Sequence, residues 1–447
     1  MQRLALLILV ALHCSILTLF AQERVDSLRA VLEAEGVEWT DGNSVVFFAS
    51  GEEKFADMFA AVRNARSSIH MEYFNFREDS IANALFNLLI EKAKEGVEVR
   101  LLFDAFGNLS NNQPLTNKKV RWLREQGLQI YKFDPIRFPW VNHIIPRDHR
   151  KIVVIDGSCA YSGGMNVADY YITGTEQVGE WHDLHYRIEG DAVSEYQKIF
   201  LRIWNKATGE DIHGPQYYPG YRRFSETCAE VTPDTSRSAK NKTIGIANRE
   251  PGTTTKVVRR TFVHLIDEAQ TSLKIINPYF TLNAPIKRAL KRAIKRGVKV
   301  EIMVSEASDI PITPRIVEFQ ARSLMKKGAE VYFYQGGFHH SKIMLVDGQW
   351  AYVGSANLDA RSLKCDYECN ALMADSAATE QLIEKFDRDV QTRCVPLTDE
   401  YWKNKSAWKR FQGWFYHLLL TPYVDNLTRP EQVQPDSDPT PSHLPIS

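Results

Sequence analysis

The sequence has no excess of charge of either sign. Its 447 residues include 55 Lys and Arg and 55 Asp and Glu, so the formal net charge is zero. The chain therefore lacks the global basic field that marks nucleic-acid-binding proteins, which disfavours a nuclease and any nucleic-acid partner. The hydrophobic share of 44% is ordinary for a globular protein, and this length allows about two to three domain-sized units.

Cysteine is sparse and has no metal-binding arrangement. The sequence contains six cysteines and no Cys-x-x-Cys pair, so no structural zinc site is expected among them. Cys14 lies in an apolar N-terminal stretch, and the odd number that remains argues against a full disulfide framework, although an oxidising compartment would allow one or two bridges. A carboxylate-rich cluster that would suit Mg²⁺ or Ca²⁺ is also missing from the sequence. We therefore expect no metal and no other cofactor.

The chemistry that is present lies in a short pattern that occurs twice. Each copy has a histidine, a lysine two residues later, an aspartate after an apolar run, and an asparagine after a glycine. The second copy contains His340, Lys342, Asp347, Ser355 and Asn357, and the first contains His149, Lys151, Asp156, Gly164 and Asn166. Side chains two apart on a strand share a face, so each imidazole lies beside an ammonium. One such pair is a weak signal, but two copies in matched contexts indicate a site that binds and attacks phosphate.

The pattern H-x-K-x4-D-x6-G-[GS]-x-N, present twice, resembles that of the phospholipase D superfamily. The resemblance extends over about residues 45–424, and bacterial cardiolipin synthases are the most similar branch. Gly164 stands where many superfamily members have serine, and cardiolipin synthases commonly have Gly-Gly at this point. The resemblance implies a two-step transfer through a phosphohistidine, without a metal.

The order of expected elements also repeats. Apolar runs that suit strands alternate with amphipathic runs that suit helices, which predicts a parallel sheet. Gly96 and Gly297, which end equivalent helices, are as far apart as Gly127 and Gly328. Such self-similarity indicates a duplication. We predict an α/β fold with two phospholipase D-like α/β domains, each with a central sheet, related by a pseudo-twofold axis and sharing one active site.

The chain divides into seven predicted segments. These are a signal peptide or membrane anchor (1–21), an N-terminal helix and linker (22–44), phospholipase D-like domain 1 (45–208), a linker with little regular structure (209–252), phospholipase D-like domain 2 (253–398), an amphipathic membrane-associating segment (399–426) and a disordered tail (427–447). In the first segment Arg3 precedes an apolar run, and cleavage after Ala21 is expected; an uncleaved anchor is the alternative.

The amphipathic segment combines bases and aromatic residues before a leucine run. Its sequence from Trp402 to Val424 suits a helix at an anionic bilayer surface, and the alternative is a helix packed on the catalytic domain. A further insertion, Pro135 to Pro146, is rich in aromatics and proline and precedes His149, where we expect it to overhang the site.

The charges of the repeated pattern suggest how the work is divided. Lys151 and Lys342 would balance the charge that grows on the phosphate oxygens during attack. Further donors to the phosphate would be Asn166, Asn357 and the Ser355 hydroxyl. One histidine would attack phosphorus, and the other would protonate the leaving alcohol and then deprotonate the incoming one. The resemblance favours His149 as the nucleophile and His340 as its acid–base partner.

Acidic residues are needed to hold the far ring nitrogens of the two histidines. Glu368 lies on an expected strand and matches the acidic position of the family, and Asp183 lies in a segment that resembles the W-x-D-x-H pattern of cardiolipin synthases. Asp156 and Asp347 belong to the catalytic motif but are expected to fix strand-end turns. Four more histidines lie near the motifs, and a structural role is their first interpretation: His143, His182, His185 and His339. Tyr73 and Tyr279 are at equivalent strand ends, where they would either pack in the core or line the pocket.

The resemblance and the motifs together predict a cardiolipin synthase-like phosphatidyltransferase. It would move a phosphatidyl group from one phosphatidylglycerol to the glycerol hydroxyl of another and release glycerol. A hydrolytic phospholipase D, with water as acceptor, uses the same histidines and is the first alternative; a nuclease and a non-catalytic lipid-binding scaffold follow. The expected partners are anionic phospholipid and the membrane surface, and the expected location is the bacterial cell membrane, with the protein either exported or anchored by its N-terminus.

Overall fold

The computed structural model describes residues 24–135, 145–219 and 241–426. The expected leader at 1–21, most of the insertion before His149 and the expected tail at 427–447 lie outside these residues. A helix over residues 24–34 is the first described element, and it leads directly into a strand.

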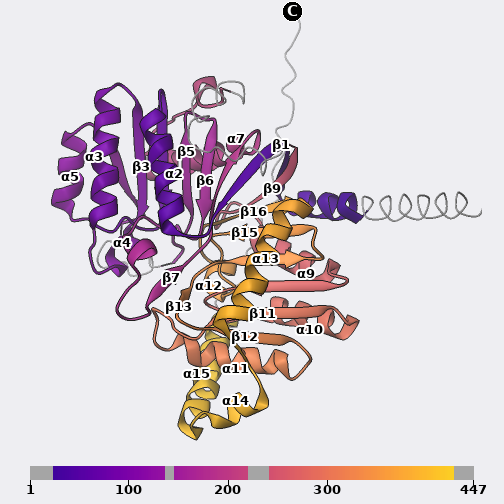
Figure 1. Cartoon of the computed structure of the whole chain (residues 1–447). Coiled ribbons are helices and arrows are strands. Elements are labelled where there is room, and N and C mark those ends of the chain that lie inside the picture. The colour runs from indigo at the N-terminus through magenta and orange to yellow at the C-terminus, as the bar shows by residue number, and fades with distance from the viewer. Residues whose placement is uncertain (1–23, 136–144, 220–240, 427–447) are drawn as a thin grey trace, which may run out of the picture.

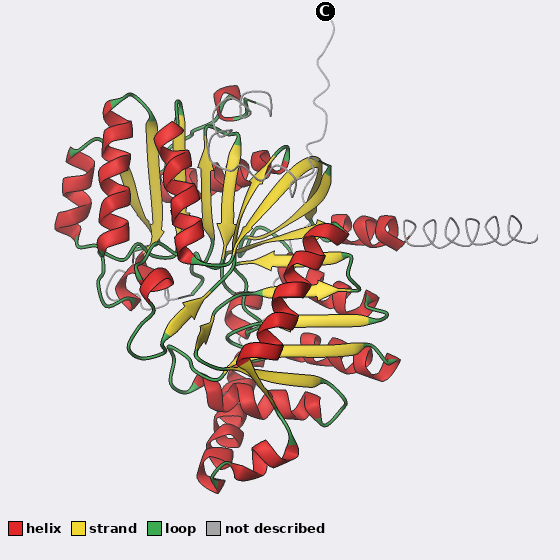
Figure 2. Cartoon of the chain, viewed as in Figure 1, coloured by secondary structure: helices red, strands yellow, loops and turns green. Residues whose placement is uncertain are grey.

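One sheet of 15 strands runs through both halves of the described chain (Figures 1 and 2). The first half contributes β1 (Val37–Phe48), β2 (Ser68–Tyr73), β3 (Glu98–Asp104), β4 (Gln129–Phe133), β5 (Lys151–Ile155), β6 (Cys159–Gly163) and β8 (His185–Glu189). The second half contributes β9 (Lys242–Arg249), β10 (Ser272–Ile276), β11 (Lys299–Ser305), β12 (Glu330–Tyr334), β14 (Ile343–Val346), β15 (Trp350–Gly354), β16 (Glu368–Ala374) and β17 (Cys394–Pro396).

The strand order shows the duplication. Outward from the centre, the first half reads β1-β8-β6-β5-β2-β3-β4 and the second reads β9-β16-β15-β14-β10-β11-β12, with β17 at the edge. Equivalent strands therefore occupy equivalent places, and β1 pairs antiparallel with β9 at the centre. This is the arrangement that a pseudo-twofold axis between β1 and β9 produces. The predicted α/β fold class is confirmed, and the two expected sheets are joined into one. The expectation of a parallel sheet is wrong: among the described strands of this sheet, only β2-β3-β4 and β10-β11-β12 pair in parallel, because the strands after each motif follow one another through short turns and pair antiparallel.

Helices cover both faces of this sheet. The first half has α2 (Gly51–Asn64), α3 (Ser80–Lys94), α5 (Asn117–Glu125) and α7 (Ala192–Thr208), and the second half has α9 (Val257–Glu268), α10 (Ala284–Arg296), α11 (Thr313–Met325) and α13 (Ser376–Arg393). Shorter or terminal helices are α4 (Ala105–Ser110), α6 (Tyr170–Thr173), α12 (Ala360–Lys364), α14 (Asp399–Asn404) and α15 (Ala407–Asn426). Residues of α7 and α13 share one apolar core that continues across both halves.

Local sequence explains where the repeated helices begin and end. The Asp79 side chain accepts from the N–H of Ala82 at the start of α3, and Asn283 caps α10 in the same way. Gly297 ends α10 with φ 90°, a left-handed conformation that glycine adopts without a steric cost. These ends place the helices so that the loops after β2, β3, β10 and β11 meet between the halves.

Two expectations about the centre of the chain are wrong. The segment 22–44 was expected to hold only a helix and a linker, but β1 begins within it at Val37 and includes Trp39. The linker expected to lack regular structure contains β9 at its end. The cause is the same in both places: β1 and β9 gain their backbone hydrogen bonds from the other half, and neither has a strong local pattern that reveals this pairing.

Candidate active site

The two repeated motifs meet at a cavity between the halves. The cavity has a volume of about 1110 Å³, and both His149 and His340 line it. Loops from the two halves form its walls, including residues 110–113 after β3 and Asp309 after β11. The structure thus brings together two histidines that are 191 positions apart in the sequence.

Backbone pairing holds His149 against the other half. The His149 N–H donates to the Tyr367 oxygen at 3.1 Å, and the Tyr367 N–H donates to the Arg147 oxygen at 2.9 Å. This parallel bridge sets His149 beside Glu368, the first residue of β16. The distance from His149 Nδ1 to Glu368 Oε1 is 3.0 Å.

His340 is held in the equivalent way. The short strands β7 (Glu180–His182) and β13 (Gly337–His339) pair in parallel, and the His340 N–H donates to the His182 oxygen at 2.6 Å. His340 Nδ1 lies 2.6 Å from Asp183 Oδ2. Each histidine is therefore oriented by the acid of the opposite half, and neither half contains a complete histidine–carboxylate pair by itself.

The two motif lysines lie beside the histidines and are buried. Lys151 Nζ donates to the His149 oxygen at 2.6 Å, and Lys342 Nζ lies 3.0 Å from His340 Nε2. Burial lowers the pKa of Lys151 to about 7 and that of Lys342 to about 8, against the opposing attraction of nearby carboxylates. An incoming phosphate would compensate this burial by pairing with both ammonium groups.

The two orienting carboxylates differ in their electrostatics. Burial raises the pKa of Glu368 to about 7, although Lys151 and the Ser355 hydroxyl oppose it. Burial would also raise the pKa of Asp183, but Lys342, His340 and hydrogen bonds outweigh it and lower that pKa below its usual value. Asp183 is thus the firmly ionised member of the pair.

The same asymmetry appears at the Gly-Gly and Gly-Ser positions. The Ser355 hydroxyl was expected to donate to the phosphate. It instead donates to Glu368 Oε2 at 2.5 Å. Gly164 is the equivalent position, and a Cβ there would lie 2.1 Å from Asp183 Oδ1. The missing side chain of Gly164 gives Asp183 the space that it occupies.

The remaining motif residues divide into two groups. Asn166 lines the cavity, and the Oδ1 atoms of Asn166 and Asn357 are buried without a hydrogen-bond partner among the described residues. Asp156 and Asp347 lie outside the site. Their carboxylates accept from consecutive backbone N–H groups of residues 66–68 and 270–272, at the far ends of β5 and β14. Although counted with the catalytic motif, both aspartates fix strand-end turns, as their positions suggested.

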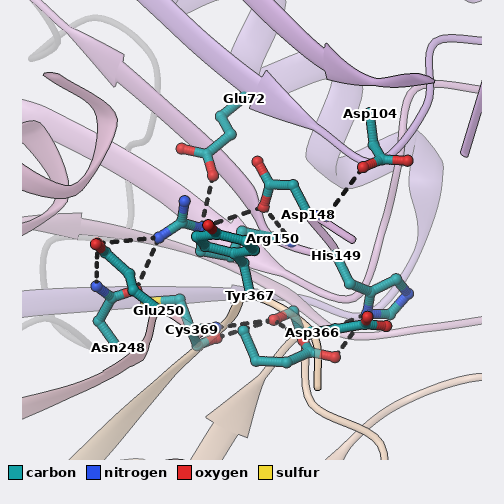
Figure 3. A network of polar contacts seen from close by, with 12 residues as sticks. Glu72, Asp104, Asp148, His149, Arg150, Asn248, Glu250, Asp366, Tyr367 and Cys369 are labelled. Atoms are coloured by element: carbon teal, nitrogen blue, oxygen red, sulfur yellow. Dashed lines mark hydrogen bonds and ion pairs between the residues drawn. The ribbon is translucent and has the colours of Figure 1, made fainter. Parts of the chain in front are cut away.

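A buried charge network supports His149 from behind (Figure 3). Arg150 Nε donates to Glu72 Oε1 at 2.6 Å and to Asp148 Oδ1 at 3.2 Å, and Nη1 donates to Asn248 Oδ1 at 2.9 Å. Because Asn248 is on β9, this guanidinium joins the two halves. Sequence reasoning missed Arg150, yet the signal was present: the residue between His149 and Lys151 must face the other side of the strand.

Aromatic side chains flank the histidines. The Phe74 ring centroid lies 5.0 Å from that of His149, and the Trp181 centroid lies 5.4 Å from that of His340. Tyr279 lines the cavity and donates to Asp309 Oδ1 at 2.6 Å. Tyr73, which was expected at an equivalent strand end, is buried in the core beside Met58. Of this pair, only Tyr279 therefore belongs to the site.

The other histidines near the motifs lie outside the described cavity lining. His182 pairs with Glu180, and His339 lies 3.5 Å from Asp389. His185 is buried next to the Gly163 turn, and His143 lies outside the described residues. Their structural interpretation needs no change.

Within the described ranges, no group of three or more His, Cys, Asp or Glu side chains is placed to hold a metal ion. Cys365, Cys369 and Cys394 are free thiols. None of the helices in the described segments is long and apolar enough to cross a bilayer.

The fold and the crossed site define a class, the duplicated α/β enzymes of the phospholipase D superfamily. The family model described as "Cardiolipin synthase, PLD-like domain" matches residues 58–204 and 262–390. The chain therefore belongs to the cardiolipin synthase family of phospholipase D-like enzymes, as the resemblance in the sequence implied.

Individual relatives agree with this membership. A cardiolipin synthase of Oceanobacillus iheyensis is 32% identical over 398 residues, which cover 89% of this chain and 79% of the relative. One of Listeria monocytogenes serotype 4a is 30% identical over 397 residues, with 88% and 78% covered. The crystal structure of phosphatidylserine synthase from Haemophilus influenzae Rd KW20 has a TM-score of 0.65 at 15% identity, covering 85% of this chain and 94% of that one; it shows the shared fold.

Proposed function

We propose that this protein is a cardiolipin synthase that joins two phosphatidylglycerol molecules. A phosphatidyl group moves from the donor lipid to the glycerol hydroxyl of the acceptor, and free glycerol leaves. The observation that carries the proposal is the pair of crossed histidine–carboxylate contacts in one cavity, which supplies a nucleophile and an acid–base group at the same phosphate.

In the first step, Nε2 of His149 attacks the donor phosphorus. The bond from phosphorus to the headgroup glycerol oxygen breaks, and His340 gives its proton to that oxygen. The products are glycerol and a phosphatidyl group bound to His149. Lys151 and Lys342 hold the phosphate oxygens, whose charge grows during attack.

In the second step, His340 acts as the base and His149 is the leaving group. His340 takes the proton from the acceptor glycerol hydroxyl, whose oxygen attacks phosphorus. The bond from phosphorus to His149 breaks, which releases the cardiolipin and restores both histidines. If water replaces the acceptor lipid, the same step gives phosphatidic acid, the product of the hydrolytic alternative.

The electrostatic asymmetry supports this division of roles. Burial, Lys151 and Lys342 hold the pKa of His149 well below its usual value, so its ring is neutral and able to attack. Burial and Lys342 lower the pKa of His340 too, but ionised Asp183 opposes this from 2.6 Å and stabilises the protonated ring that an acid needs.

The C-terminal helices support a membrane location for the enzyme. α15 packs one face on α11, where the Phe319 and His417 rings lie 5.0 Å apart. Its other face exposes five large apolar side chains to solvent: Trp408, Phe411, Trp414, Phe415 and Leu418. A helix with this composition suits the interface of an anionic bilayer. We propose that segment 399–426 binds the membrane surface, and that the protein is exported or N-terminally anchored at the bacterial cell membrane.

Lipid analysis tests the proposal. The full chain is expressed in a bacterial host that lacks its own cardiolipin, and lipids are measured by mass spectrometry. Cardiolipin is expected with the intact gene and not with a His149→Ala variant. The purified enzyme should release one glycerol for each cardiolipin formed from phosphatidylglycerol. Phosphatidic acid as the main product would instead establish the hydrolase.

A further inference from the structure

The interior of the active-site cavity is polar almost throughout. Its lining contains no Val, Leu, Ile or Met among the described residues, and its few large apolar surfaces are the aromatic rings of Phe74, Tyr170, Trp181 and Tyr279. The other lining residues are mainly carboxylates, amides, hydroxyls and the two histidines. Such a cavity suits a phosphate and a polyol headgroup, but it offers no aliphatic groove for acyl chains.

Exposed aliphatic side chains instead adjoin the lining segments of the cavity along the chain. Leu109 is 64% exposed and adjoins lining residue Ser110, while Ile310 is 46% exposed and adjoins lining residue Asp309. Ile172, on α6, is also exposed and precedes Thr173 in the lining. Ile312 extends the same loop as Ile310. We call these four residues, Leu109, Ile172, Ile310 and Ile312, the apolar mouth.

The apolar mouth follows the symmetry of the duplication. Leu109 is on α4, which follows β3, and Ile310 is in the loop after β11, the strand equivalent to β3. They are as far apart in the sequence as Gly96 and Gly297, which end the equivalent helices α3 and α10. Both halves therefore present one exposed aliphatic side chain at the same place beside the shared cavity.

Hydrogen bonds hold the mouth loops in place. Gln177 Nε2, from the first half, donates to the Asp309 oxygen of the second half at 3.1 Å. The Glu78 N–H donates to the Gln113 oxygen at 2.8 Å, which ties the loop after α4 to the loop before α3. The exposed aliphatic side chains thus project from α4, α6 and the braced loop after β11, and their exposure is a property of the folded site.

From these observations we infer that the apolar mouth is a bilayer-docking surface, through which the headgroup enters while the acyl chains stay in the membrane. The inference rests on the proposed phospholipid substrate. Two acyl chains need an apolar surrounding, and the cavity does not supply one. Exposed aliphatic side chains at the mouth would enter the acyl boundary of the bilayer and bring the polar cavity directly over a lipid headgroup.

Neutral substitutions at the equivalent positions test this inference. Leu109→Gln and Ile310→Gln are combined in the full chain, and Val31→Gln is the matched control because Val31 is exposed to 42% on the N-terminal helix. Turnover is measured with phosphatidylglycerol vesicles and with dihexanoyl phosphatidylglycerol below its micelle concentration. For the double variant, turnover on vesicles should fall at least about tenfold, while turnover of the monomeric lipid stays within about twofold. Unchanged turnover on vesicles, or equal losses on both substrates, would overturn the inference.

Hydrogen exchange gives a readout that does not depend on turnover. Peptides over residues 106–113, 170–176 and 307–313 should become more strongly protected when the wild-type protein binds phosphatidylglycerol vesicles than when it binds dihexanoyl phosphatidylglycerol, whose headgroup reaches only the cavity lining. Protection that instead rises with protein concentration without vesicles would assign the surface to a second copy of the chain. If vesicles protect these peptides but neither lipid is turned over, the proposed function fails while the docking surface stands.

Discussion

Asp183 Oδ2 lies 2.6 Å from His340 Nδ1, although the two residues come from opposite halves of the duplicated chain. Glu368 makes the reciprocal contact with His149 at 3.0 Å. Neither half can therefore orient its own histidine. The duplication is maintained as one chain with one site, and a change to either acid acts on the motif of the other half.

Removing the negative charge of Asp183 should be more harmful than removing that of Glu368. Asp183→Asn should lower kcat by about 10³-fold, because the amide no longer stabilises protonated His340. Glu368→Gln should cost less near neutral pH, because burial already raises the pKa of Glu368 to about 7. Steady-state kinetics at pH 7 compare the two, with Asp389→Asn, beside His339, as the control. A larger loss for Glu368→Gln would contradict the assigned asymmetry.

The two histidines should be separable by the leaving group of the substrate. His149→Ala and His340→Ala should each reduce turnover of phosphatidylglycerol by several orders of magnitude. A phosphatidyl ester of p-nitrophenol needs no protonation as it leaves, so only His340→Ala should recover the first step. Release of p-nitrophenol is followed by absorbance, with the exposed His213→Ala variant as control. Recovery by His149→Ala alone would reverse the two roles.

Gly164 should not tolerate the serine that many superfamily members have at this position. A Cβ at residue 164 would lie 2.1 Å from Asp183 Oδ1, and that carboxylate is fixed by the Leu184 N–H. Gly164→Ser should displace Asp183 and lower kcat at least about tenfold. Ser355→Ala removes one hydrogen bond from Glu368, which is worth about 1.5–3 kcal/mol. If that hydrogen bond acts only in the transition state, kcat of Ser355→Ala should fall about 10 to 150-fold. Thermal unfolding of the same variants checks that the fold is kept. Full activity of Gly164→Ser would show that Asp183 does not need this space.

The pH dependence of kcat/KM should be bell-shaped with its maximum close to neutrality. As pH rises through about 7 to 8, Lys151 and Lys342 lose the protons that pair with phosphate, so the rate falls. As pH falls through about 7, Glu368 gains a proton and holds His149 less firmly, so the rate also falls. The variant Lys342→Arg should keep its charge and extend the residual activity to higher pH. A flat profile up to pH 10 would contradict the buried state of both lysines.

Activity should persist after exhaustive chelation. The two ammonium groups beside the histidines supply the positive charge that a metal would otherwise bring to the phosphate. Turnover of monomeric dihexanoyl phosphatidylglycerol is measured with and without EDTA, since this substrate avoids effects of divalent ions on vesicles. A loss that only an added metal restores would contradict the mechanism.

Much of the site followed from spacing alone. The repeated His-x-Lys pattern predicted that His149 and His340 share a cavity, and Asp156 and Asp347 were expected at turns because each ends an apolar run. The acids Glu368 and Asp183 were named from the resemblance to the family and not from spacing. Their crossing could not be predicted, because it depends on the backbone bridge from His149 to Tyr367 and on the pairing of β7 with β13 between halves.

The parts that sequence reasoning missed are set by contacts between distant segments. β9 was hidden in a polar connection because its partner β1 comes from the other half. Leu109, on α4, and Ile310, in the loop after β11, are single aliphatic residues, and no local pattern distinguishes them from core residues. The Ser355 hydroxyl was expected to bind phosphate, because the sequence does not show that Glu368 Oε2 accepts its hydrogen bond.

The most direct test of the central claim is to trap the covalent intermediate. The purified enzyme is mixed with phosphatidylglycerol that carries a ³²P-labelled phosphate, quenched during turnover under conditions that preserve phosphohistidine, digested and mapped by mass spectrometry. We predict a phosphatidyl label on the peptide that contains His149, absent from His149→Ala and accumulating when the acceptor is withheld. Label on the peptide with His340, and never on that with His149, would reverse the roles of the two histidines; turnover without label on either would contradict the two-step transfer itself.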